Sequence, residues 1–239
     1  MKIVATLSLS ALLFASCFNF NGKRVKGNGN IATLTKSVNE FHNVDLSGTF
    51  DIYLTQGPTA PVKIEGDDNI ISHIKITQTG DKLELGTEDG FKYSTSKSIK
   101  VYLTSPQFKS IDVSGAGDIK GTNQLTSNDE LSVSTSGAGN IDLDIDAPKF
   151  STDISGAGDI KLKGQIKDGS ISISGAGSAH CYDLLTENLT IDISGMGSAD
   201  VFASKTLNAQ ISGAGSISYK GTATVTKQVS GMGSIKKAD

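Results

Sequence analysis

The chain has 239 residues, of which 37% are hydrophobic and 20% charged, and its formal net charge is −3. This composition is too apolar and too weakly charged for a disordered chain, and it lacks the positive charge that attracts nucleic-acid phosphates. Two Cys exclude a disulfide scaffold, and three His provide few ligands for a metal centre. We therefore expect a folded protein with no cofactor, no metal and no nucleic-acid partner.

The first 16 residues have the layout of a secretory signal peptide. Lys2 supplies a positive charge, residues 3–14 contain only apolar residues, Ser and Thr, and two small residues precede Cys17. About a dozen apolar residues are too few to span a bilayer. The ending Leu13 to Cys17 resembles the lipobox of bacterial lipoproteins, which implies cleavage before Cys17 and lipidation of its side chain. The alternative is an ordinary secretory peptide that contains a Cys.

Residues 17–37 are predicted to be the lipidated Cys and a flexible tether. The stretch from Asn19 to Asn30 is rich in Asn, Gly and Lys and shows no apolar periodicity. A lipid anchor at Cys17 would make the membrane a partner. It would place the protein in the cell envelope, at the outer membrane.

Residues 57–104 are predicted to form an antiparallel or irregular β segment at the N-terminal end of the folded domain. Residues 74–76 and 83–85 alternate apolar with polar side chains on either side of a turn at residues 79–81, a pattern that indicates a hairpin. Residues 99–103 form a further short strand by the same criterion.

From residue 105 to residue 236 the chain repeats itself every 18 to 22 residues. Each copy contains Ser-Gly-Ala-Gly or Ser-Gly-Met-Gly, and apolar and polar residues alternate on both sides of it. Such alternation indicates half-buried strands, and a unit of this kind buries its apolar face only by stacking on identical units. We therefore predict stacked parallel coils with glycines at one corner. The copies begin at Ser114, Ser136, Ser155, Ser174, Ser194, Ser212 and Ser230, with a degenerate copy at Ser47.

In such a stack, outward residues one repeat apart become neighbours, and opposite charges are favoured between them. Lys120, Asp142 and Lys161 fall into one column of this kind, and Asp144 is expected to face Lys163. The acidic residues of this face are therefore predicted to lie on a neutralised surface and not to form a metal site.

The residue after each Gly-x-Gly invites comparison with calcium-binding repeats. In those repeats the Asp stands two residues after the last Gly, whereas here it follows that Gly directly and later copies carry Ser. We interpret this column as turn residues that bond their own backbone. Its members are Asp51, Asp118, Asn140 and Asp159. Cys181 falls in an inward column and is expected to be a buried, unreactive thiol.

The opening from Phe41 to Gly57 and the repeated Gly-Asp-Ile or Gly-Asn-Ile core, at residues 117–119, 139–141 and 158–160, support a family resemblance. Together they resemble the putative auto-transporter adhesin, head GIN domain family of secreted bacterial lipoproteins. The resemblance implies an all-β domain over residues 38–239. It also implies a right-handed, single-stranded parallel β-helix similar to the pectin-lyase-like solenoids, and a role in adhesion.

One outward patch is a candidate ligand contact. His180 and Tyr182 are predicted to lie beside Asp200 and Phe202 on the adjacent coil. Exposed aromatic side chains flanked by polar groups suit a glycan or a cell-surface protein ligand. The alternative is that the return loop around residues 184–185 covers this face.

These features favour a non-enzymatic lipoprotein of the cell envelope, acting as an adhesin or as a binding and structural module at the surface or in the periplasm. The alternative is a carbohydrate-active enzyme, a polysaccharide lyase or hydrolase built on a β-helix. Such an enzyme needs clustered carboxylates or a metal, and often a basic residue. The sole Arg, Arg24, lies in the predicted tether, and no catalytic residue is assigned.

Overall fold

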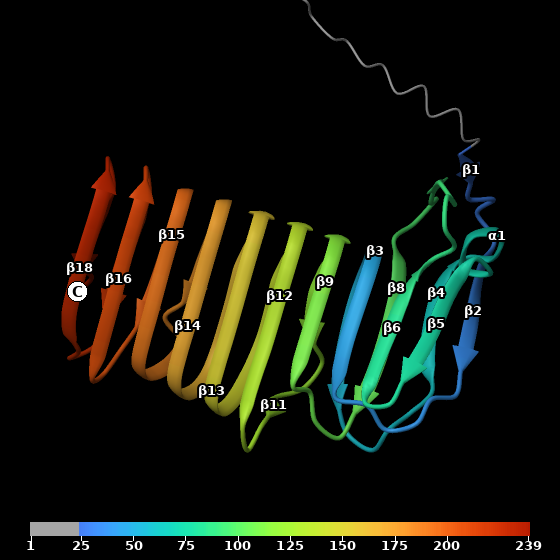
Figure 1. Ribbon diagram of the computed structural model, residues 1–239, viewed down its shortest axis with the longest axis horizontal. Helices are drawn as coiled ribbons and strands as arrows, with labels where there is room; N and C mark the ends of the chain where they lie inside the picture. The colour runs from blue at the N-terminus through green and yellow to red at the C-terminus, as the bar shows by residue number, and fades with distance from the viewer. Residues whose placement is uncertain (1–23) are drawn as a thin grey trace, which may run out of the picture.

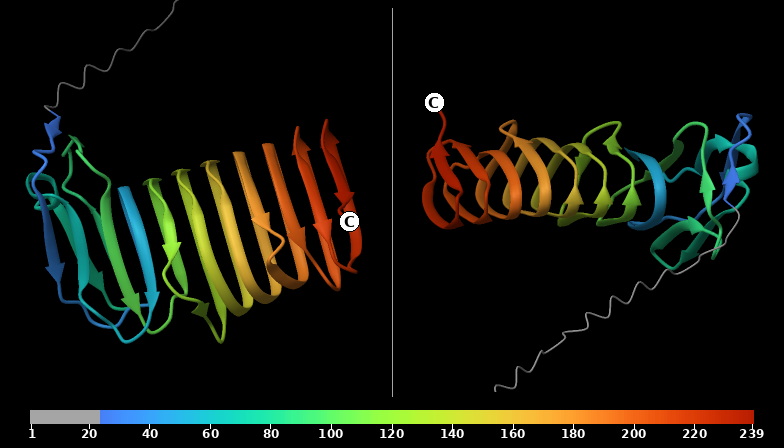
Figure 2. Two further views of the ribbon diagram at one scale, coloured as in Figure 1. Left: turned by 180° about the vertical axis from the view of Figure 1, so that it is seen from behind. Right: turned by 90° about the horizontal axis from the view of Figure 1, so that it is seen from above.

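The computed structural model describes residues 24–239, and the predicted signal peptide and lipidation site at Cys17 lie outside these residues. The described chain is a β-solenoid whose coils lie side by side along one axis (Figures 1 and 2). The prediction of an all-β parallel solenoid is confirmed. Within residues 24–239, no helix is long and apolar enough to cross a membrane.

The repeats form the regular coils, and each coil pairs in parallel with the next. Ser136 lies beside Ser114 on one side and beside Ser155 on the other, so the register predicted from the repeat is confirmed. The strands of these coils are β9 (Ser110–Ala116), β10 (Ile119–Gly121), β11 (Leu125–Thr126), β12 (Glu130–Ala138), β13 (Ile141–Ala157), β14 (Ile160–Cys181), β15 (Leu184–Phe202), β16 (Thr206–Gly213), β17 (Ser216–Lys220), β18 (Thr224–Gly231) and β19 (Ser234–Lys237).

The inward residues of every coil fill the interior of the solenoid. Val133 and Ile171 are at most 1% exposed and belong to one inward column, in which Thr152 lies between them. Fully burying a side chain of this kind stabilises the fold by roughly 1.5–3 kcal/mol relative to leaving it in water. Cys181 is buried among them as predicted, and this burial raises the pKa of its thiol to about 12.

Glycine is required where successive coils turn the same corner. Gly137 and Gly156 both have φ of +139°, a region that side chains with a Cβ rarely adopt. A Cβ at Gly156 would stand 1.9 Å from the carbonyl oxygen of Gly137, one coil away. The corner glycines are therefore needed for the backbones of neighbouring coils to approach one another.

A ladder of side chains crosses the coils next to this corner. The Asp118 Oδ1 accepts a hydrogen bond of 3.1 Å from the Asn140 backbone N–H, and the Asn140 Oδ1 accepts one of 3.0 Å from the Asp159 N–H. The Asp159 Oδ1 in turn accepts from the Ser178 N–H at 3.0 Å. The prediction that these residues bond their own backbone was wrong. They bond the backbone N–H of the equivalent residue on the next coil, which the in-register stacking places beside each side chain.

The degenerate copy at Ser47 occupies a position that the repeat spacing does not reveal. Strand β3 (Asn43–Gln56) pairs with β9 on one side, where Gly48 lies beside Gly115. On its other side it pairs in parallel with β6 (Lys82–Thr87) and β8 (Ile99–Ser105). Figure 1 shows β3 in blue between the green strand β8 and the yellow-green strand β9. The chain thus builds one coil, leaves it to build the N-terminal end, and returns to the opposite side of that coil.

The segment at residues 57–104 is partly as predicted. Strands β5 (Ile74–Thr79) and β6 form the expected antiparallel hairpin. However, β6 and β8 also run parallel to β3, so this segment continues the solenoid instead of being antiparallel or irregular throughout. A short helix, α1 (Asp68–Ile71), buries Ile70 and Ile71 at this end of the molecule.

The predicted tether is wrong for the part that the structure describes. Strand β2 (Ile31–Lys36) pairs antiparallel with β4 (Val62–Asp67) and belongs to the large sheet. Strand β1 (Val25–Lys26) pairs in parallel with β7 (Tyr93–Ser94). Main-chain pairing holds these strands in place, and Val25, Ala32 and Leu34 are partly buried against the core.

Asp67 fixes the residues between β1 and β2. Its buried carboxylate accepts hydrogen bonds from the Gly29 N–H at 2.8 Å, the Ser96 N–H at 2.8 Å and the Ser96 hydroxyl at 2.7 Å. The hydrogen bond from the Ser96 side chain, followed by that from its backbone, lowers the pKa of Asp67 below the ordinary 3.8. The carboxylate therefore ties the start of the described chain to the loop before β8.

Candidate functional site

The structure brings His180 and Asp200 together as the sequence predicted. The two residues are direct neighbours on β14 and β15, and the His180 Nδ1 lies 3.5 Å from the Asp200 Oδ2. Their side chains are 56% and 39% exposed. A contact between side chains with this exposure contributes at most about 1 kcal/mol to stability. Its place on the outer wall leaves both groups accessible to a ligand.

Tyr182 does not join Phe202. Its hydroxyl donates a hydrogen bond of 2.7 Å to the Ser218 Oγ, and the Lys220 ammonium lies 4.9 Å from its ring centroid. Tyr182 thus reaches along the solenoid axis to β17, two coils from its own. No ring contact joins Tyr182 and Phe202, although both lie in the described part of the chain. Because Cys181 pairs with Val201, Tyr182 and Phe202 are at the same level on adjacent coils as predicted, but their rings do not pack on one another.

The neighbouring charged column is neutralised largely as predicted. Lys120 lies beside Asp142, and Asp142 beside Lys161. The Lys163 ammonium is 3.4 Å from the Asp144 carboxylate. The ion pair of Lys120, however, is with Asp118 of its own coil, at 3.2 Å. Among residues 24–239, no three His, Cys, Asp or Glu side chains are grouped so that they could hold a metal ion.

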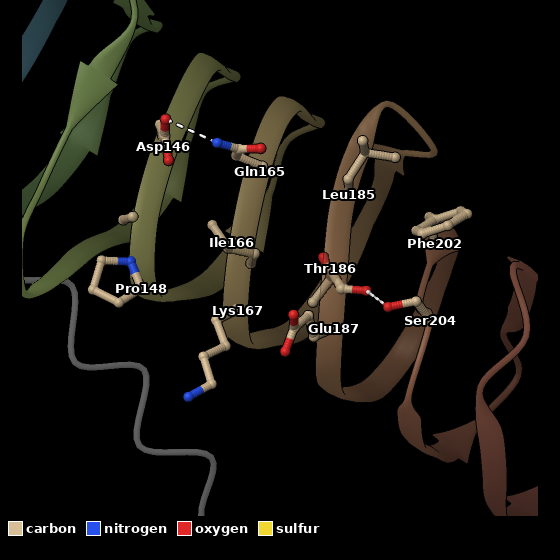
Figure 3. A pocket seen from close by; sticks show the side chains of 11 residues that line it. Asp146, Pro148, Gln165, Ile166, Lys167, Leu185, Thr186, Glu187, Phe202 and Ser204 are labelled. Carbon is tan, nitrogen blue, oxygen red and sulfur yellow. Dashed lines mark hydrogen bonds between the residues drawn. The ribbon is translucent and has the colours of Figure 1, made fainter.

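Phe202 instead lines a groove of about 380 Å³ on the outside of four successive coils (Figure 3). We call this the Phe202 groove. Its apolar residues come from β13, β14 and β15 and its polar residues stand among them, as in many small-molecule sites. The lining consists of Asp146, Ala147, Pro148, Gln165, Ile166, Lys167, Leu185, Thr186, Glu187, Phe202 and Ser204.

Alternation along β15 explains the exposed leucine of this groove. Leu184 and Thr186 point inward and are at most 2% exposed, so Leu185 points outward and is 54% exposed. The equivalent outward residues on the preceding coils are Gln165 and Asp146. The loop around residues 184–185 therefore does not cover the predicted patch. Figure 3 shows that Leu185 stands next to Phe202 and forms part of the groove.

Polar side chains along the Phe202 groove are held in defined positions. The Gln165 amide donates a hydrogen bond of 3.0 Å to the Asp146 carboxylate, and the Glu187 carboxylate lies 2.7 Å from the Lys205 ammonium. The Ser204 hydroxyl donates to the Thr186 carbonyl oxygen at 3.3 Å. These contacts fix hydrogen-bonding groups around an apolar floor that contains Ile166 and Phe202.

Sequence reasoning found Phe202 but missed the rest of the groove. The available signal was Leu185, an apolar residue in an outward column whose other members are polar. Ile166 gave no such signal, because it is 4% exposed and lies in a buried column with Ala147 and Thr186.

The family and the solved relatives agree with the architecture. The family model described as putative auto-transporter adhesin, head GIN domain matches residues 40–223. A putative adhesin from Bacteroides fragilis is 29% identical, with a TM-score of 0.85 over 90% of this chain and 100% of that chain. A putative adhesin from Parabacteroides distasonis is 25% identical, with a TM-score of 0.68 over 90% and 100%.

A third solved structure, a putative lipid binding protein from Parabacteroides distasonis, is 21% identical, with a TM-score of 0.75 over 91% of this chain and 100% of that chain. At this identity the likeness shows the fold alone. Among curated proteins, no match to the chain was found. Because the family model covers most of its length, the chain belongs to the putative auto-transporter adhesin, head GIN domain family.

Proposed function

We propose that this protein is a non-enzymatic, lipid-anchored binding module of the bacterial cell envelope and that its Phe202 groove binds a glycan. The groove carries the proposal because a partly exposed aromatic ring, Phe202, and an exposed leucine, Leu185, lie there among fixed carboxylate, amide and hydroxyl groups. Adhesin-like relatives support a binding role for the chain.

The chemistry of a sugar ring matches this arrangement. One face of a pyranose exposes C–H groups, which pack on the apolar surface of a ring such as Phe202. Its rim carries hydroxyl groups, which donate to carboxylates such as Asp146 and accept from amides such as Gln165. The groove follows the axis of the solenoid, where the coil spacing of about 4.8 Å repeats the pattern of contacts along an extended chain.

The anchoring part of the proposal rests on the N-terminal sequence. Cys17 follows an apolar stretch and two small residues, the arrangement of a lipobox. Diacylation of Cys17 would hold the protein stably at a membrane. In this proposal the membrane is the outer membrane, and the solenoid presents its groove to the surroundings of the cell envelope.

Glycan binding is tested on an array of neutral and acidic oligosaccharides. The wild-type chain should bind at least one of them, and Phe202→Ala should weaken that binding about tenfold or more through lost apolar contact. Tyr182→Ala is the matched aromatic control, because Tyr182 lies outside the groove, and it should change binding less than twofold. Absence of wild-type binding, or equal binding by Phe202→Ala, would contradict the proposal.

The anchor is tested separately with Cys17→Ser. Wild-type protein should incorporate labelled palmitate and fractionate with the outer membrane, whereas the variant should do neither. Protease treatment of intact cells then distinguishes the two faces of that membrane. Rapid digestion is expected for a surface adhesin, and full protection would place the protein in the periplasm and rule out adhesion to other cells.

A further inference from the structure

Two methionines interrupt the column of small residues at the glycine corner. The third residue of each Ser-Gly-x-Gly copy is Ala in most coils but Met at positions 196 and 232. Met196 is 69% exposed and Met232 is 89% exposed. Large apolar side chains with this exposure are unusual on a folded protein, and where they group together they mark interaction sites.

The two methionines stand on either side of a single hollow. This hollow has a volume of about 470 Å³, and its floor between Met196 and Met232 is formed by Ala214 and Gly215. The remaining lining residues are Gly or Ser, and no charged side chain lines it. It shares no lining residue with the Phe202 groove. This corner thus has an uncharged floor of Ala214 and Gly215 between the apolar side chains of Met196 and Met232.

The separation of the methionines follows from the solenoid. The Ala214 N–H donates to the Gly195 carbonyl oxygen at 2.9 Å, and the Met232 N–H donates to the Gly213 carbonyl oxygen at 2.9 Å. Met196, Ala214 and Met232 therefore belong to successive coils, and the two methionines are two coil spacings apart. At about 4.8 Å per coil this is about 9.6 Å. Methionine sulfur contacts an aromatic ring at about 5 Å, so one ring placed midway meets both sulfurs.

We infer that Met196 and Met232 form a clamp for a single aromatic side chain of a partner protein, seated over Ala214. This methionine clamp goes beyond the proposed function, because it is a protein-docking surface apart from the glycan groove. The absence of charge around the hollow selects a Phe, Tyr or Trp flanked by small uncharged residues. Unbranched methionine side chains adjust to the ring without strain.

The inference is tested by NMR on the full chain carrying ¹³C-labelled methionine methyl groups. The probe is a blocked Ser-Thr-Trp-Thr-Ser peptide, and the control is the same peptide with Leu in place of Trp. The Trp peptide should shift the Met196 and Met232 methyl signals upfield through the ring current, and the Leu peptide should not. Met196→Ala or Met232→Ala should weaken binding about two- to tenfold. Both variants restore the residue that other coils carry, so they should fold normally.

A variant that regains binding distinguishes the methionine clamp from nonspecific hydrophobic binding. In a Met232→Ala background, Ala157→Met places a thioether two coils from Met196 on its other side and should restore the upfield shifts. Ala176→Met places one only a single coil away, too close for a ring to enter, and should not restore them. The inference is overturned if the wild type shows no shift with the Trp peptide, if the Leu peptide shifts the signals equally, or if Ala176→Met restores binding as well as Ala157→Met does.

Discussion

The Asp118 carboxylate holds Asn140 of the next coil by two hydrogen bonds, one of 3.1 Å from its backbone N–H and one of 2.9 Å from its side-chain amide. Burial opposes ionisation of Asp118, but these bonds and the ion pair with Lys120 outweigh it and lower the pKa of Asp118 below the ordinary 3.8. In this ladder the Asp118 and Asp159 carboxylates each accept a hydrogen bond from a backbone N–H of the next coil.

Replacing Asn140 with Asp should destabilise the solenoid. The change removes the side-chain donor and adds a fourth carboxylate to those of Asp51, Asp118 and Asp159 in one column, which should cost about 1–2 kcal/mol at pH 7. Thermal unfolding followed by circular dichroism measures the loss. The loss should shrink as the pH is lowered, because protonation of the added carboxyl group removes its repulsion with the neighbouring carboxylates. Asn140→Ser copies the residue type of the later coils and should cost less. Equal stability of Asn140→Asp and wild type at pH 7 would argue against the ladder.

Asp67 should control how firmly the start of the described chain is held. Asp67→Ala removes the acceptor for Gly29 and Ser96, so trypsin should cleave after Lys26 at least tenfold faster than in the wild type. Mass spectrometry of timed digests measures the rate. Asp89→Ala, an exposed acid on the nearby loop, serves as the control and should leave the rate unchanged. If Asp67→Ala is cleaved no faster, the carboxylate does not anchor this segment.

The same anchor should release in acid. Because the folded-state pKa of Asp67 is lowered, its stabilising contribution is complete above its ordinary value of 3.8. That contribution is lost as the pH falls below 3.8 and through the folded-state pKa. Hydrogen exchange of the Gly29 and Ser96 amides should therefore rise below pH 3.8 by more than the intrinsic exchange chemistry predicts. In Asp67→Asn this additional rise should be absent.

Adding a methyl group at the glycine corner should strongly lower the free energy of unfolding. In Gly156→Ala the Cβ would meet the Gly137 carbonyl oxygen at 1.9 Å in a backbone conformation with φ of +139°. Neither backbone can move without breaking the pairing between coils, so the free energy of unfolding should fall by at least about 3 kcal/mol. Soluble yield and the midpoint of urea unfolding measure it. Gly57→Ala, whose Cβ would lie no closer than 3.7 Å to its neighbour, should be nearly neutral.

The thiol of Cys181 should be unreactive while the protein is folded. Burial raises its pKa to about 12, so almost no thiolate forms at pH 8. In a Cys17→Ser background, Ellman's reagent should therefore detect almost no thiol in the native protein and one thiol per chain in urea. Rapid reaction in native buffer would show that the interior opens at β14.

The repeat by itself determined the register of the coils. Apolar residues alternate with period two, and a slip by one residue would turn every inward side chain outward. The glycine corner permits only one alignment of neighbouring turns. For these reasons the sequence was sufficient to predict that Lys120, Asp142 and Lys161 are neighbours, that Cys181 is buried and that His180 meets Asp200.

Only the tertiary structure decided the contacts that join unlike parts of the chain. Gly48 lies beside Gly115, 67 residues later, because β3 is enclosed between strands made afterwards. Strand β2 pairs with β4, but Ala32 and Leu34 are only partly buried, so its six residues carry too weak an alternation to predict the strand. Phe202 lies beside Leu185 in the groove, whereas the Tyr182 hydroxyl bonds to Ser218 two coils away, because a side chain's direction on the wall depends on packing across several coils. Local alternation sets which face a residue takes, whereas its neighbours on that face depend on how the whole chain is wound.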